Sequence, residues 1–496
     1  MQYLKTFLSI EVNISTHCHF VSLKMTDCFV EDENNFLMKK IIIIGAGISG
    51  LACAKRLREF GFQKVVILEA RNRIGGRVHG MKLDSTTLQM GAQWIHGQSN
   101  NEIYKLAESN NLIDLEEFEY TKSMRNFSNL AEEERKALTN LFVYLDEKIA
   151  QIPKVNPPGT SMQKYLKDQF QIYISDIDHS ILEYVQSGFN WYCKVLLELD
   201  SCSSLSLVSL NLYHNYEECA GNPGVEVKGG LSSILDIFIK AIPTDWLSIN
   251  KHVIQIDWSS FQNNHQNIQS TKEIRVICED KSVYSADHVV VTIPLGCLKK
   301  NHHSLFVPPL SKSKEDAIQY LGFGTINKIY LQFDKPFWDG PAIFKVLPHQ
   351  NKSLEGWTQW INRFAYTPGC SDVLCAWLVG EGAIAMQTVA EDEVVKCCMN
   401  ILENILKKTL PMPSKIFRTS WNSDNFACGT YSFLSIDCEV NGVSQMTLAE
   451  PEYDDDKKHP VLMFAGEATN GSHFATIHGA YETGVREAER IFQFYG

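Results

Sequence analysis

The hydrophobic pattern near residue 40 predicts a strand, a glycine-rich turn, a helix and a second strand. Residues 41–44 are an uninterrupted β-branched run, which is typical of a strand buried on both faces. Residues 51–57 show helical spacing of apolar positions, and Gly61 is expected to end that helix. Residues 65–69 form a second apolar run that ends in an acidic side chain. This order predicts a βαβ unit with a parallel sheet.

Further along the chain the pattern adds a strand and a helical region. Residues 288–294 contain the apolar run Val289–Val291 and end in proline, so we expect another parallel strand of the same sheet. Residues 130–149 carry charged and apolar side chains at helical spacing, so the segment 99–220 should be largely helical. No stretch reaches the 18 or more consecutive apolar residues that a membrane helix requires.

The turn after the first strand has the spacing G-x-G-x-x-G. Gly45 permits a tight turn, Gly47 allows the backbone to approach a pyrophosphate, and Gly50 lets the helix pack on the strand. A pyrophosphate at the helix N-terminus is favoured by free N–H groups and the helix dipole. Glu69 follows Gly50 at the distance where an acidic side chain can bind ribose hydroxyls. Together these features predict a dinucleotide-binding unit.

Composition narrows the class of protein. The chain has 496 residues, of which 44% are hydrophobic, and this suits an enzyme with more than one domain. A formal charge of −12 argues against a nucleic-acid partner and weakly favours cationic ligands. The 14 cysteines have no regular spacing and no C-x-x-C, so we expect free, mostly buried thiols in a reducing compartment.

Residues 1–37 precede the first predicted strand and are interpreted as an N-terminal extension that we expect to be disordered. The segment is a poor secretory signal, and Met25 and Met38 are alternative starting points. The chain ends Phe-Tyr-Gly, which is not a peroxisomal Ser-Lys-Leu address. A cytoplasmic location is therefore expected, with the peroxisome less favoured. The oligomeric state is left open.

The sequence at 69–77, Glu-Ala-Arg-Asn-Arg-Ile-Gly-Gly-Arg, resembles the E-A-x-x-R-x-G-G-R signature of the flavin amine oxidase superfamily. Residues 461–467 are similar to the closing strand of that family, whose acidic residue contacts the ribityl chain. The resemblance implies FAD rather than NAD as the cofactor. It implies the cofactor-binding residues Gly45, Gly47, Gly50, Glu69, Ala70, Arg71, Gly75, Gly76, Arg77, Gly91, Ala92, Trp94, Val253, Trp421, Gly466, Glu467, Thr476 and Ile477.

The same resemblance implies an α/β fold in which a Rossmann-like FAD-binding domain is interleaved with an α+β substrate-binding domain. Because the cofactor motifs are far apart in the sequence, the FAD domain is expected to be discontinuous. Its predicted pieces are 38–98, 221–300 and 415–496, and the substrate-binding domain is predicted at 99–220 and 301–414.

Two motifs resemble those of a smaller group of enzymes within this superfamily. Residues 91–97, Gly-Ala-Gln-Trp-Ile-His-Gly, are similar to a motif of animal polyamine oxidases and spermine oxidases, and the resemblance places His96 in the substrate tunnel near the flavin. Residues 322–329 resemble the family stretch whose lysine, here Lys328, holds a water against flavin N5. The resemblance therefore implies that His96 and Lys328 are catalytic residues.

The C-terminal motifs define the attachment of the flavin and the substrate contacts. Residues 420–432 resemble the segment whose tryptophan packs near the isoalloxazine; monoamine oxidases carry a flavin-linked cysteine nine positions after it, where this chain has Thr430. Cys428 is out of register, so non-covalent FAD is expected. Thr476 is expected to border flavin and substrate, in a motif approached by His473-Phe474-Ala475, whereas animal relatives are threonine-rich there.

Family members hold a distal ammonium group with an acidic residue of the helical domain, and Glu198 is the nearest candidate here. A surface carboxylate without a function is an equally good interpretation of this residue. The substrate-binding residues predicted are therefore His96, Glu198 and Thr476.

The function that the resemblance implies is FAD-dependent oxidation of a secondary amine of a polyamine by hydride transfer to flavin N5. The products would be a shorter polyamine, an aminoaldehyde and hydrogen peroxide, with molecular oxygen as the second substrate. Spermine, an N1-acetylpolyamine and spermidine remain alternatives, as does the C–N bond that breaks. Oxidation of another amine or an amino acid, demethylation of protein lysines and a non-catalytic flavin-fold binding protein are the rival functions.

Overall fold

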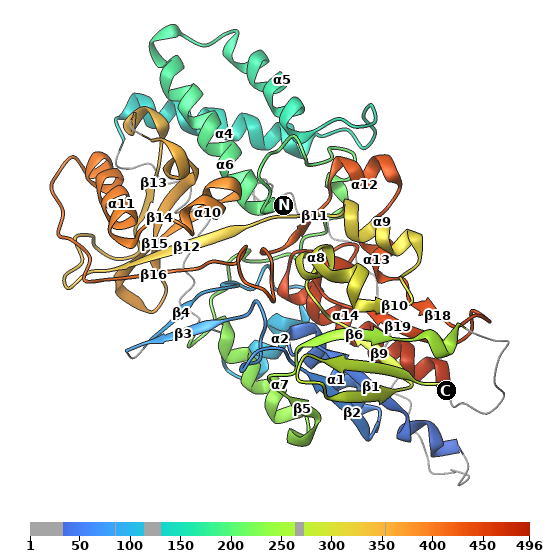
Figure 1. Ribbon diagram of the computed structural model, residues 1–496. Coiled ribbons are helices and arrows are strands. Elements are labelled where there is room, and N and C mark those ends of the chain that lie inside the picture. The colour runs from blue at the N-terminus through green and yellow to red at the C-terminus, as the bar shows by residue number, and fades with distance from the viewer. Residues whose placement is uncertain (1–32, 85, 114–129, 263–271, 353) are drawn as a thin grey trace.

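The computed structural model describes residues 33–84, 86–113, 130–262, 272–352 and 354–496 (Figure 1). Residues 1–32 of the predicted N-terminal extension lie outside the described residues. A short 3-10 helix at Glu33–Met38 leads into the first strand. The six-stranded sheet lies at the lower right of Figure 1, three long helices at the top and a second sheet at the left.

The β-branched runs form an open six-stranded sheet with the order β18-β19-β9-β1-β2-β5. Its pairings are parallel, except that β18 runs antiparallel to β19. The strands are β1 (Lys40–Ile44), β2 (Lys64–Leu68), β5 (Leu247–Ser248), β9 (His288–Val291), β18 (Glu452–Tyr453) and β19 (Pro460–Phe464). The predicted strands at 41–44, 65–69, 288–294 and 461–467 are thus confirmed as neighbours in one sheet.

Both faces of this sheet are buried, as the uninterrupted apolar runs predict. Ile41 and Ile43 face one hydrophobic cluster, and Ile42 and Ile44 face another, because successive side chains point to opposite faces. The first face is covered by α1 (Ile48–Glu59), α7 (Leu235–Ala241) and the C-terminal helix α14 (Ile477–Tyr495). Each fully buried isoleucine contributes roughly 1.5–3 kcal/mol relative to an exposed one.

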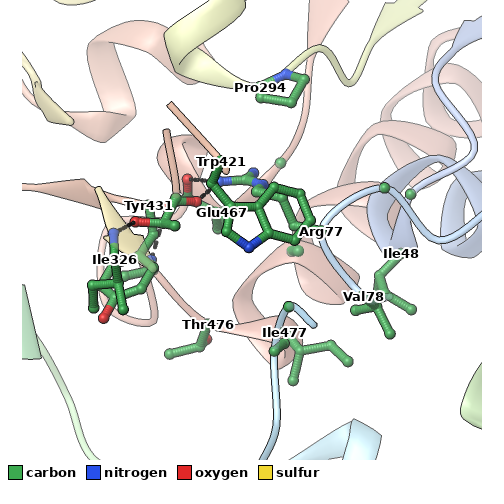
Figure 2. Close-up of a pocket in the computed structure, with 18 of the residues that line it drawn as sticks. Ile48, Arg77, Val78, Pro294, Ile326, Trp421, Tyr431, Glu467, Thr476 and Ile477 are labelled. Atoms are coloured by element: carbon green, nitrogen blue, oxygen red, sulfur yellow. Dashed lines mark hydrogen bonds and ion pairs between the residues drawn. The ribbon is translucent and has the colours of Figure 1, made fainter. Parts of the chain in front are cut away.

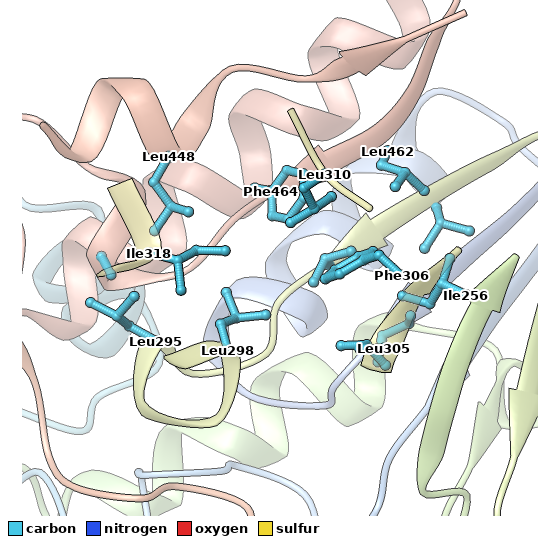
Figure 3. Close-up of a cluster of buried hydrophobic side chains, with 14 of the residues drawn as sticks. Ile256, Leu295, Leu298, Leu305, Phe306, Leu310, Ile318, Leu448, Leu462 and Phe464 are labelled. Atoms are coloured by element: carbon cyan, nitrogen blue, oxygen red, sulfur yellow. The ribbon is translucent and has the colours of Figure 1, made fainter. Parts of the chain in front are cut away.

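The opposite face packs against a four-stranded sheet and short helices (Figure 3). That sheet has the order β10-β6-β7-β8, with β6 (Val253–Asp257), β7 (Ile274–Cys278), β8 (Val283–Ala286) and β10 (Phe306–Val307). The helices are α8 (Leu295–Leu305), α9 (Lys312–Tyr320), α12 (Ile436–Asn441) and α13 (Gln445–Ala449). Figure 3 shows Phe306 and Phe464 side by side in this cluster, where their ring centroids are 6.0 Å apart.

The rest of the chain forms a helical layer and an antiparallel sheet. The predicted helical segment contains α2 (Glu102–Ser109), α4 (Glu132–Ala150), α5 (Met162–Ile174) and α6 (Leu182–Asp200), which confirms its helical character. The sheet has the order β13-β14-β15-β12-β16, formed by β12 (Ile326–Gln332), β13 (Ile343–Lys345), β14 (Ile361–Thr367), β15 (Cys370–Val379) and β16 (Lys415–Arg418). Helices α10 (Gly380–Met386) and α11 (Glu391–Leu406) pack on it.

Two small pairings complete the fold. The hairpin β3 (Gly80–Leu83) and β4 (Thr86–Gln89) ends next to the motif at 91–97, and β11 (Gly322–Phe323) pairs with β17 (Ser432–Phe433). Further 3-10 turns are His179–Ile181, Tyr213–Asn215, Leu231–Ile234, Thr244–Trp246, Ser259–Phe261, Pro348–Gln350, Gly356–Trp360 and Glu467–Thr469.

The α/β class and the interleaved arrangement are as predicted, since the strands of the six-stranded sheet come from three distant parts of the chain, 40–68, 247–291 and 452–464. One predicted boundary disagrees with the strand pairing. Residues 415–418 were assigned to the FAD domain, but β16 pairs with β12 in the five-stranded sheet, with Arg418 opposite Ile329. The remaining domain boundaries stay a prediction.

The cysteines that the structure describes are free thiols, and most of them are buried, in agreement with the sequence pattern. Within the described ranges no helix has both the length and the apolar character needed to cross a membrane.

Candidate functional site

A single cavity of about 570 Å³ brings the predicted site residues together. It extends from the glycine-rich turn before α1 to the face of β12 and the end of α6. Every residue predicted to bind cofactor or substrate lines it, except Gly50. Figure 2 shows Ile48 and Val78 at one end, Ile326 and Tyr431 at the other, and Trp421 between them. The individual roles assigned from the sequence remain predictions.

The glycine-rich turn is built for a close approach by a ligand. Gly45 has a φ of +107°, which only glycine adopts without strain, and its N–H donates to the carbonyl of Leu68. A Cβ on Gly50 would lie 2.0 Å from the carbonyl oxygen of Gly45, so this glycine allows the helix to pack on the turn. A Cβ on Gly47 would meet nothing within 4 Å, because this glycine faces the cavity.

The first turn of α1 is open to an anion. Gly47 occupies the N-cap position without a side-chain cap, and the first turn contains no acidic residue. The free N–H groups and the positive end of the helix dipole therefore point at the cavity. Arg71 and Lys251 also line the cavity, where they are paired with Asp424 and Asp280. These features fit the pyrophosphate of a dinucleotide.

Glu69 lies at the end of β2, where the sequence predicts a ribose contact. Its carboxylate accepts hydrogen bonds from the backbone N–H groups of Ala46 (2.8 Å) and Arg71 (2.9 Å). These bonds fix the carboxylate at the edge of the cavity next to the glycine-rich turn. The position fits recognition of ribose hydroxyls, which donate to a carboxylate.

Arg77 and Glu467 are joined in an ion pair on the cavity wall. The guanidinium Nη1 of Arg77 lies 2.8 Å from Oε1 of Glu467 and also donates to the carbonyl of Thr430. The other carboxylate oxygen accepts from the Ser432 hydroxyl (2.6 Å) and the Ala475 N–H (3.0 Å). Glu467 is therefore held firmly, and a contact with the ribityl chain would be made by an oxygen that is already hydrogen-bonded.

His96 is buried and neutral. Its Nδ1 lies 2.7 Å from the carbonyl oxygen of Pro223, which can only accept, so Nδ1 carries the proton and Nε2 is the acceptor nitrogen. Burial lowers the pKa of His96 to about 3. The side chain thus offers a hydrogen-bond acceptor rather than a charge to a molecule in the cavity.

Lys328 projects from β12, which lies between β15 and β16, to the motif at 91–97. Its ammonium donates to the carbonyl oxygens of Gln89 (2.8 Å) and Gly91 (2.9 Å) and to the side-chain oxygen of Gln93 (2.9 Å). It also lies 4.3 Å from the ring centroid of Trp377. Burial lowers the pKa of Lys328 to about 8. Of the three acceptors only Gln93 is a side chain, so this is the partner that a water molecule can replace.

Glu198 lines the cavity, but its carboxylate is already paired. Arg363 of β14 binds it with both terminal nitrogens, one of them at 2.7 Å, and Asn362 donates to it as well. The side chains of Arg363 and Glu198 are only 2% and 12% exposed. The carboxylates of the described cavity lining, those of Glu69, Glu198 and Glu467, are each held by N–H groups or a guanidinium. The predicted role of Glu198 as an ammonium anchor is weakened by this pairing.

Replacing Glu198 by glutamine distinguishes a structural role, as the ion-pair partner of Arg363, from the predicted role as an anchor for a substrate ammonium group. We expect Glu198→Gln to lower the free energy of unfolding by about 3 kcal/mol, because it leaves the guanidinium of Arg363 buried without a counter-charge. Urea unfolding measures this, with Asp168→Asn in the exposed Lys164–Asp168 pair as a control that should change stability by less than about 1 kcal/mol. Unchanged stability combined with a raised KM for a cationic amine would instead favour the anchor role.

The segment after β16 provides the wall beside the predicted flavin position. Trp421 donates from its indole nitrogen to the carbonyl of Met90 at 3.0 Å, which fixes the ring against the cavity. Thr430, nine positions on, lines the cavity, whereas the sulfur of Cys428 lies 3.8 Å from that of Cys297. This arrangement agrees with non-covalent attachment, which remains a prediction.

Thr476 caps α14 and also borders the cavity. Its hydroxyl accepts from the N–H of Gly479 at 3.0 Å. Ile477 follows it on the same wall, and Figure 2 shows both below Trp421, with open space between them and the indole ring.

Several lining residues were not predicted from the sequence. Trp377 of β15 stacks on Trp94 with ring centroids 5.3 Å apart, and Trp191 and Tyr192 of α6 extend the aromatic wall. No motif marks these aromatics. Arg363 was detectable in part, because a charged side chain inside the apolar strand 361–367 requires a buried partner.

Residues 48–492 match the family described as flavin containing amine oxidoreductase. The chain is similar to the peroxisomal N(1)-acetyl-spermine/spermidine oxidase of Bos taurus, with 29% identity over 497 residues that cover 92% of this chain and 95% of that protein. It is 31% identical to the lysine-specific histone demethylase 2 of Homo sapiens, over 92% of this chain and 54% of that protein.

The fold resembles that of a solved putrescine oxidase variant with redesigned cofactor binding. The TM-score is 0.66 at 19% identity, and the match covers 92% of this chain and 99% of that one. At this level of identity the similarity shows the fold.

Proposed function

The chain belongs to the flavin containing amine oxidoreductase family, and from this premise we propose that it oxidises a secondary amine of a polyamine, with an N1-acetylated polyamine as the preferred substrate. FAD is the cofactor, in agreement with the prediction from the sequence. The observation that carries the proposal is the continuous cavity, which joins the dinucleotide cradle at Gly47 to an aromatic end that contains His96 and Lys328.

The two ends of the cavity would bind different molecules, FAD at the glycine-rich turn and the amine at the aromatic end. The turn at Gly47, Glu69 and Arg77 would hold the pyrophosphate and ribose portions of FAD. Bound FAD supplies the two-electron acceptor and passes the electrons to oxygen. The overall reaction consumes the amine, one oxygen and one water, and gives an aldehyde, a shorter amine and hydrogen peroxide.

Loss of hydride requires a neutral reacting nitrogen, because an ammonium cannot release electron density to the adjacent carbon. The walls of Trp94, Trp377 and Trp421 exclude water and favour the neutral amine. The acceptor nitrogen of neutral His96 can receive the amine N–H and orient the substrate.

The preference for an acetylated end follows from the paired state of Glu198. Its carboxylate is neutralised by Arg363, so the described lining offers little to a terminal ammonium at that end. A neutral acetamide does not need a counter-charge. We therefore expect a higher kcat/KM for N1-acetylspermine than for spermine.

The pH dependence of the reaction should show no titration of His96. Its folded pKa, about 3, lies below the ordinary value of 6.5, so the ring is neutral throughout the working range. By linkage, its contribution to stability is complete above pH 6.5 and is lost as pH falls toward 3. We expect His96→Asn to lower kcat/KM by about 10–100-fold through loss of orientation. The factor should be the same from pH 6 to pH 10; a ratio that changes with pH near 6.5 would contradict a neutral His96.

The function itself is tested by peroxide release from purified yellow protein. N1-acetylspermine, spermine, spermidine, benzylamine and an L-amino acid are supplied in turn. Peroxide with either of the first two supports polyamine oxidation, and their ratio tests the preference for the acetylated end. If none of the polyamines gives peroxide while FAD stays bound, the proposal is rejected. A methylated lysine peptide is a useful further substrate, given the similarity to a histone demethylase.

A further inference from the structure

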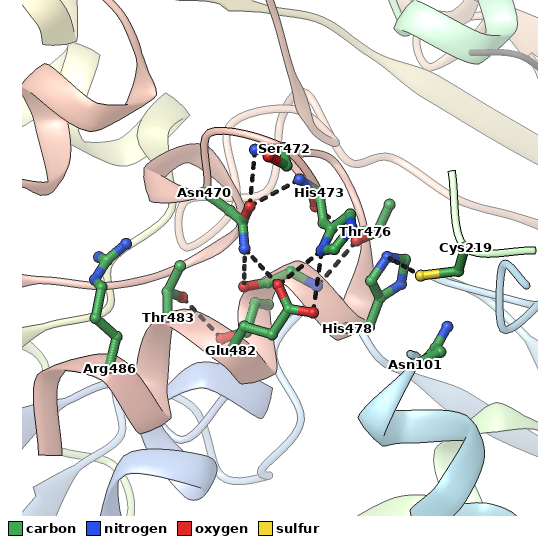
Figure 4. A network of polar contacts seen from close by, with 12 residues as sticks. Asn101, Cys219, Asn470, Ser472, His473, Thr476, His478, Glu482, Thr483 and Arg486 are labelled. Carbon is green, nitrogen blue, oxygen red and sulfur yellow. Dashed lines mark hydrogen bonds and ion pairs between the residues drawn. The ribbon is translucent and has the colours of Figure 1, made fainter. Parts of the chain in front are cut away.

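A cluster of potential metal ligands lies beside the cavity and is not used by the proposed reaction. Cys219 comes from the loop after α6, His473 from the loop before α14, and His478 from the first turn of α14. Their ligand atoms lie within 4.8 Å of one another, and Nε2 of His478 is 3.8 Å from the sulfur of Cys219. Figure 4 shows the three side chains converging from these separate segments.

His473 is held in the orientation of a metal-binding histidine. Its Nδ1 lies 2.8 and 3.1 Å from the two carboxylate oxygens of Glu482, so Nδ1–H donates and Nε2 remains as the ligand atom. Glu482 also accepts from the side-chain amide of Asn470 at 2.8 Å. A carboxylate behind a histidine is the usual support of a ligating imidazole, because it fixes the tautomer and raises ligand basicity. His473 is also a departure from the threonine-rich family pattern.

His478 supplies the third potential ligand. Its side chain is fully buried, and Nδ1 has no hydrogen-bond partner among the described residues. Nε2 lies on the side of the ring that faces Cys219, 3.8 Å from its sulfur, so Nε2 is the nitrogen available as a ligand and Nδ1 carries the proton.

We propose that Cys219, His473 and His478 bind a zinc ion. One thiolate and two imidazoles form the mixed sulfur and nitrogen set that zinc prefers in a tetrahedral site. With bonds of about 2.3 Å to sulfur and 2.0–2.1 Å to nitrogen, tetrahedral ligands lie roughly 3.5 Å apart. The Cys219–His478 separation of 3.8 Å is close to this value. The fourth position is left for water or a small anion.

The site is placed to stabilise one wall of the cavity. His478 follows directly after Thr476 and Ile477, which line the cavity at the start of α14. A zinc ion would join this helix start to the loop at Cys219, two segments that are 259 residues apart in the chain.

A second cluster, formed by His302, His303 and Glu315, provides an internal control. It has no thiolate, its two histidines are adjacent in sequence, and the His303 side chain is 77% exposed. We therefore expect this cluster to bind metal weakly or not at all.

Cobalt(II) titration of the purified, chelator-treated holoenzyme tests the proposal. Tetrahedral cobalt with a thiolate ligand absorbs in the red, where the flavin does not, so we expect a red band that saturates at one equivalent and disappears when zinc is added. Cys219→Ser should abolish the band, and Glu482→Gln should lower cobalt affinity by about 10–100-fold. Cys397→Ser and His303→Asn should leave it unchanged.

Unchanged flavin absorbance and melting temperature in the chelator-treated variants show that they remain folded. No red band with one equivalent of cobalt, or a band of full intensity in Cys219→Ser, would overturn the proposal. Because the readout is metal binding, either result leaves the assignment of polyamine oxidation to be decided by the peroxide assay.

Discussion

Replacing Lys328 by methionine should lower turnover by about 100-fold or more while FAD stays bound. Methionine has a similar length but cannot donate a hydrogen bond, so the water that the family resemblance assigns to Lys328 loses its partner. The ammonium also positions the backbone at Gln89 and Gly91, which lies on the cavity wall. Stopped-flow reduction under anaerobic conditions and reoxidation with oxygen would show which half-reaction is slowed.

Lys314 provides a matched control for this substitution. Its ammonium is also buried and donates hydrogen bonds to the backbone carbonyl oxygens of Thr447, Leu448 and Glu450. The ammonium lies 4.3 Å from the ring centroid of Phe464. It does not line the cavity. Each variant leaves buried carbonyl groups unsatisfied, so both should lose stability by about 1–3 kcal/mol. Unchanged turnover in Lys328→Met, or an equal loss in Lys314→Met, would contradict the catalytic role.

Replacing Gly47 by alanine should reduce FAD affinity by about 100-fold, or roughly 2.7 kcal/mol, without destabilising the apoprotein. Gly47 has an ordinary φ of −76°, and an added methyl group meets no protein atom within 4 Å. The methyl group instead occupies the position where the backbone must approach the pyrophosphate. Flavin fluorescence titration of the apoprotein measures the affinity, and thermal unfolding measures the stability.

Gly50→Ala is the companion variant with the opposite prediction for folding. Its methyl group would lie 2.0 Å from the carbonyl oxygen of Gly45, so it should destabilise the apoprotein as well as weaken FAD binding. If Gly47→Ala binds FAD like the unaltered protein, the ligand does not approach this turn, and the placement of the pyrophosphate is wrong.

Some elements of the fold are determined by residues that lie close together in the sequence. The strand, glycine turn and helix at 41–57 were predictable because a continuous apolar run and the glycine spacing determine them within a few turns. The same holds for His96, whose motif follows the β3–β4 hairpin directly. The tautomer of His96, by contrast, depends on Pro223, which lies 127 residues away.

Pairings between distant residues could not be obtained in this way. The partner of Glu198 is Arg363, 165 residues away on β14, and nothing near Glu198 indicates it. The assignment of residues 415–418 failed for the same reason, because a short strand gives no sign of which sheet it joins. The hydrogen-bond acceptors of Lys328 lie more than 230 residues before it in the chain, so these hydrogen bonds could not be predicted from the sequence either.

The order of strands in the six-stranded sheet has a consequence for how the protein is made. Strand β1 lies between β2 and β9, and β9 lies next to β19. The six-stranded sheet therefore cannot be completed until residue 464, the last of β19, has left the ribosome. Helix α1 likewise keeps an apolar face exposed until α14, the last element of the chain, arrives to cover it. Such high contact order makes folding slow and leaves strand edges exposed during synthesis. The newborn chain should therefore depend on chaperones until residues 464–495 have been synthesised.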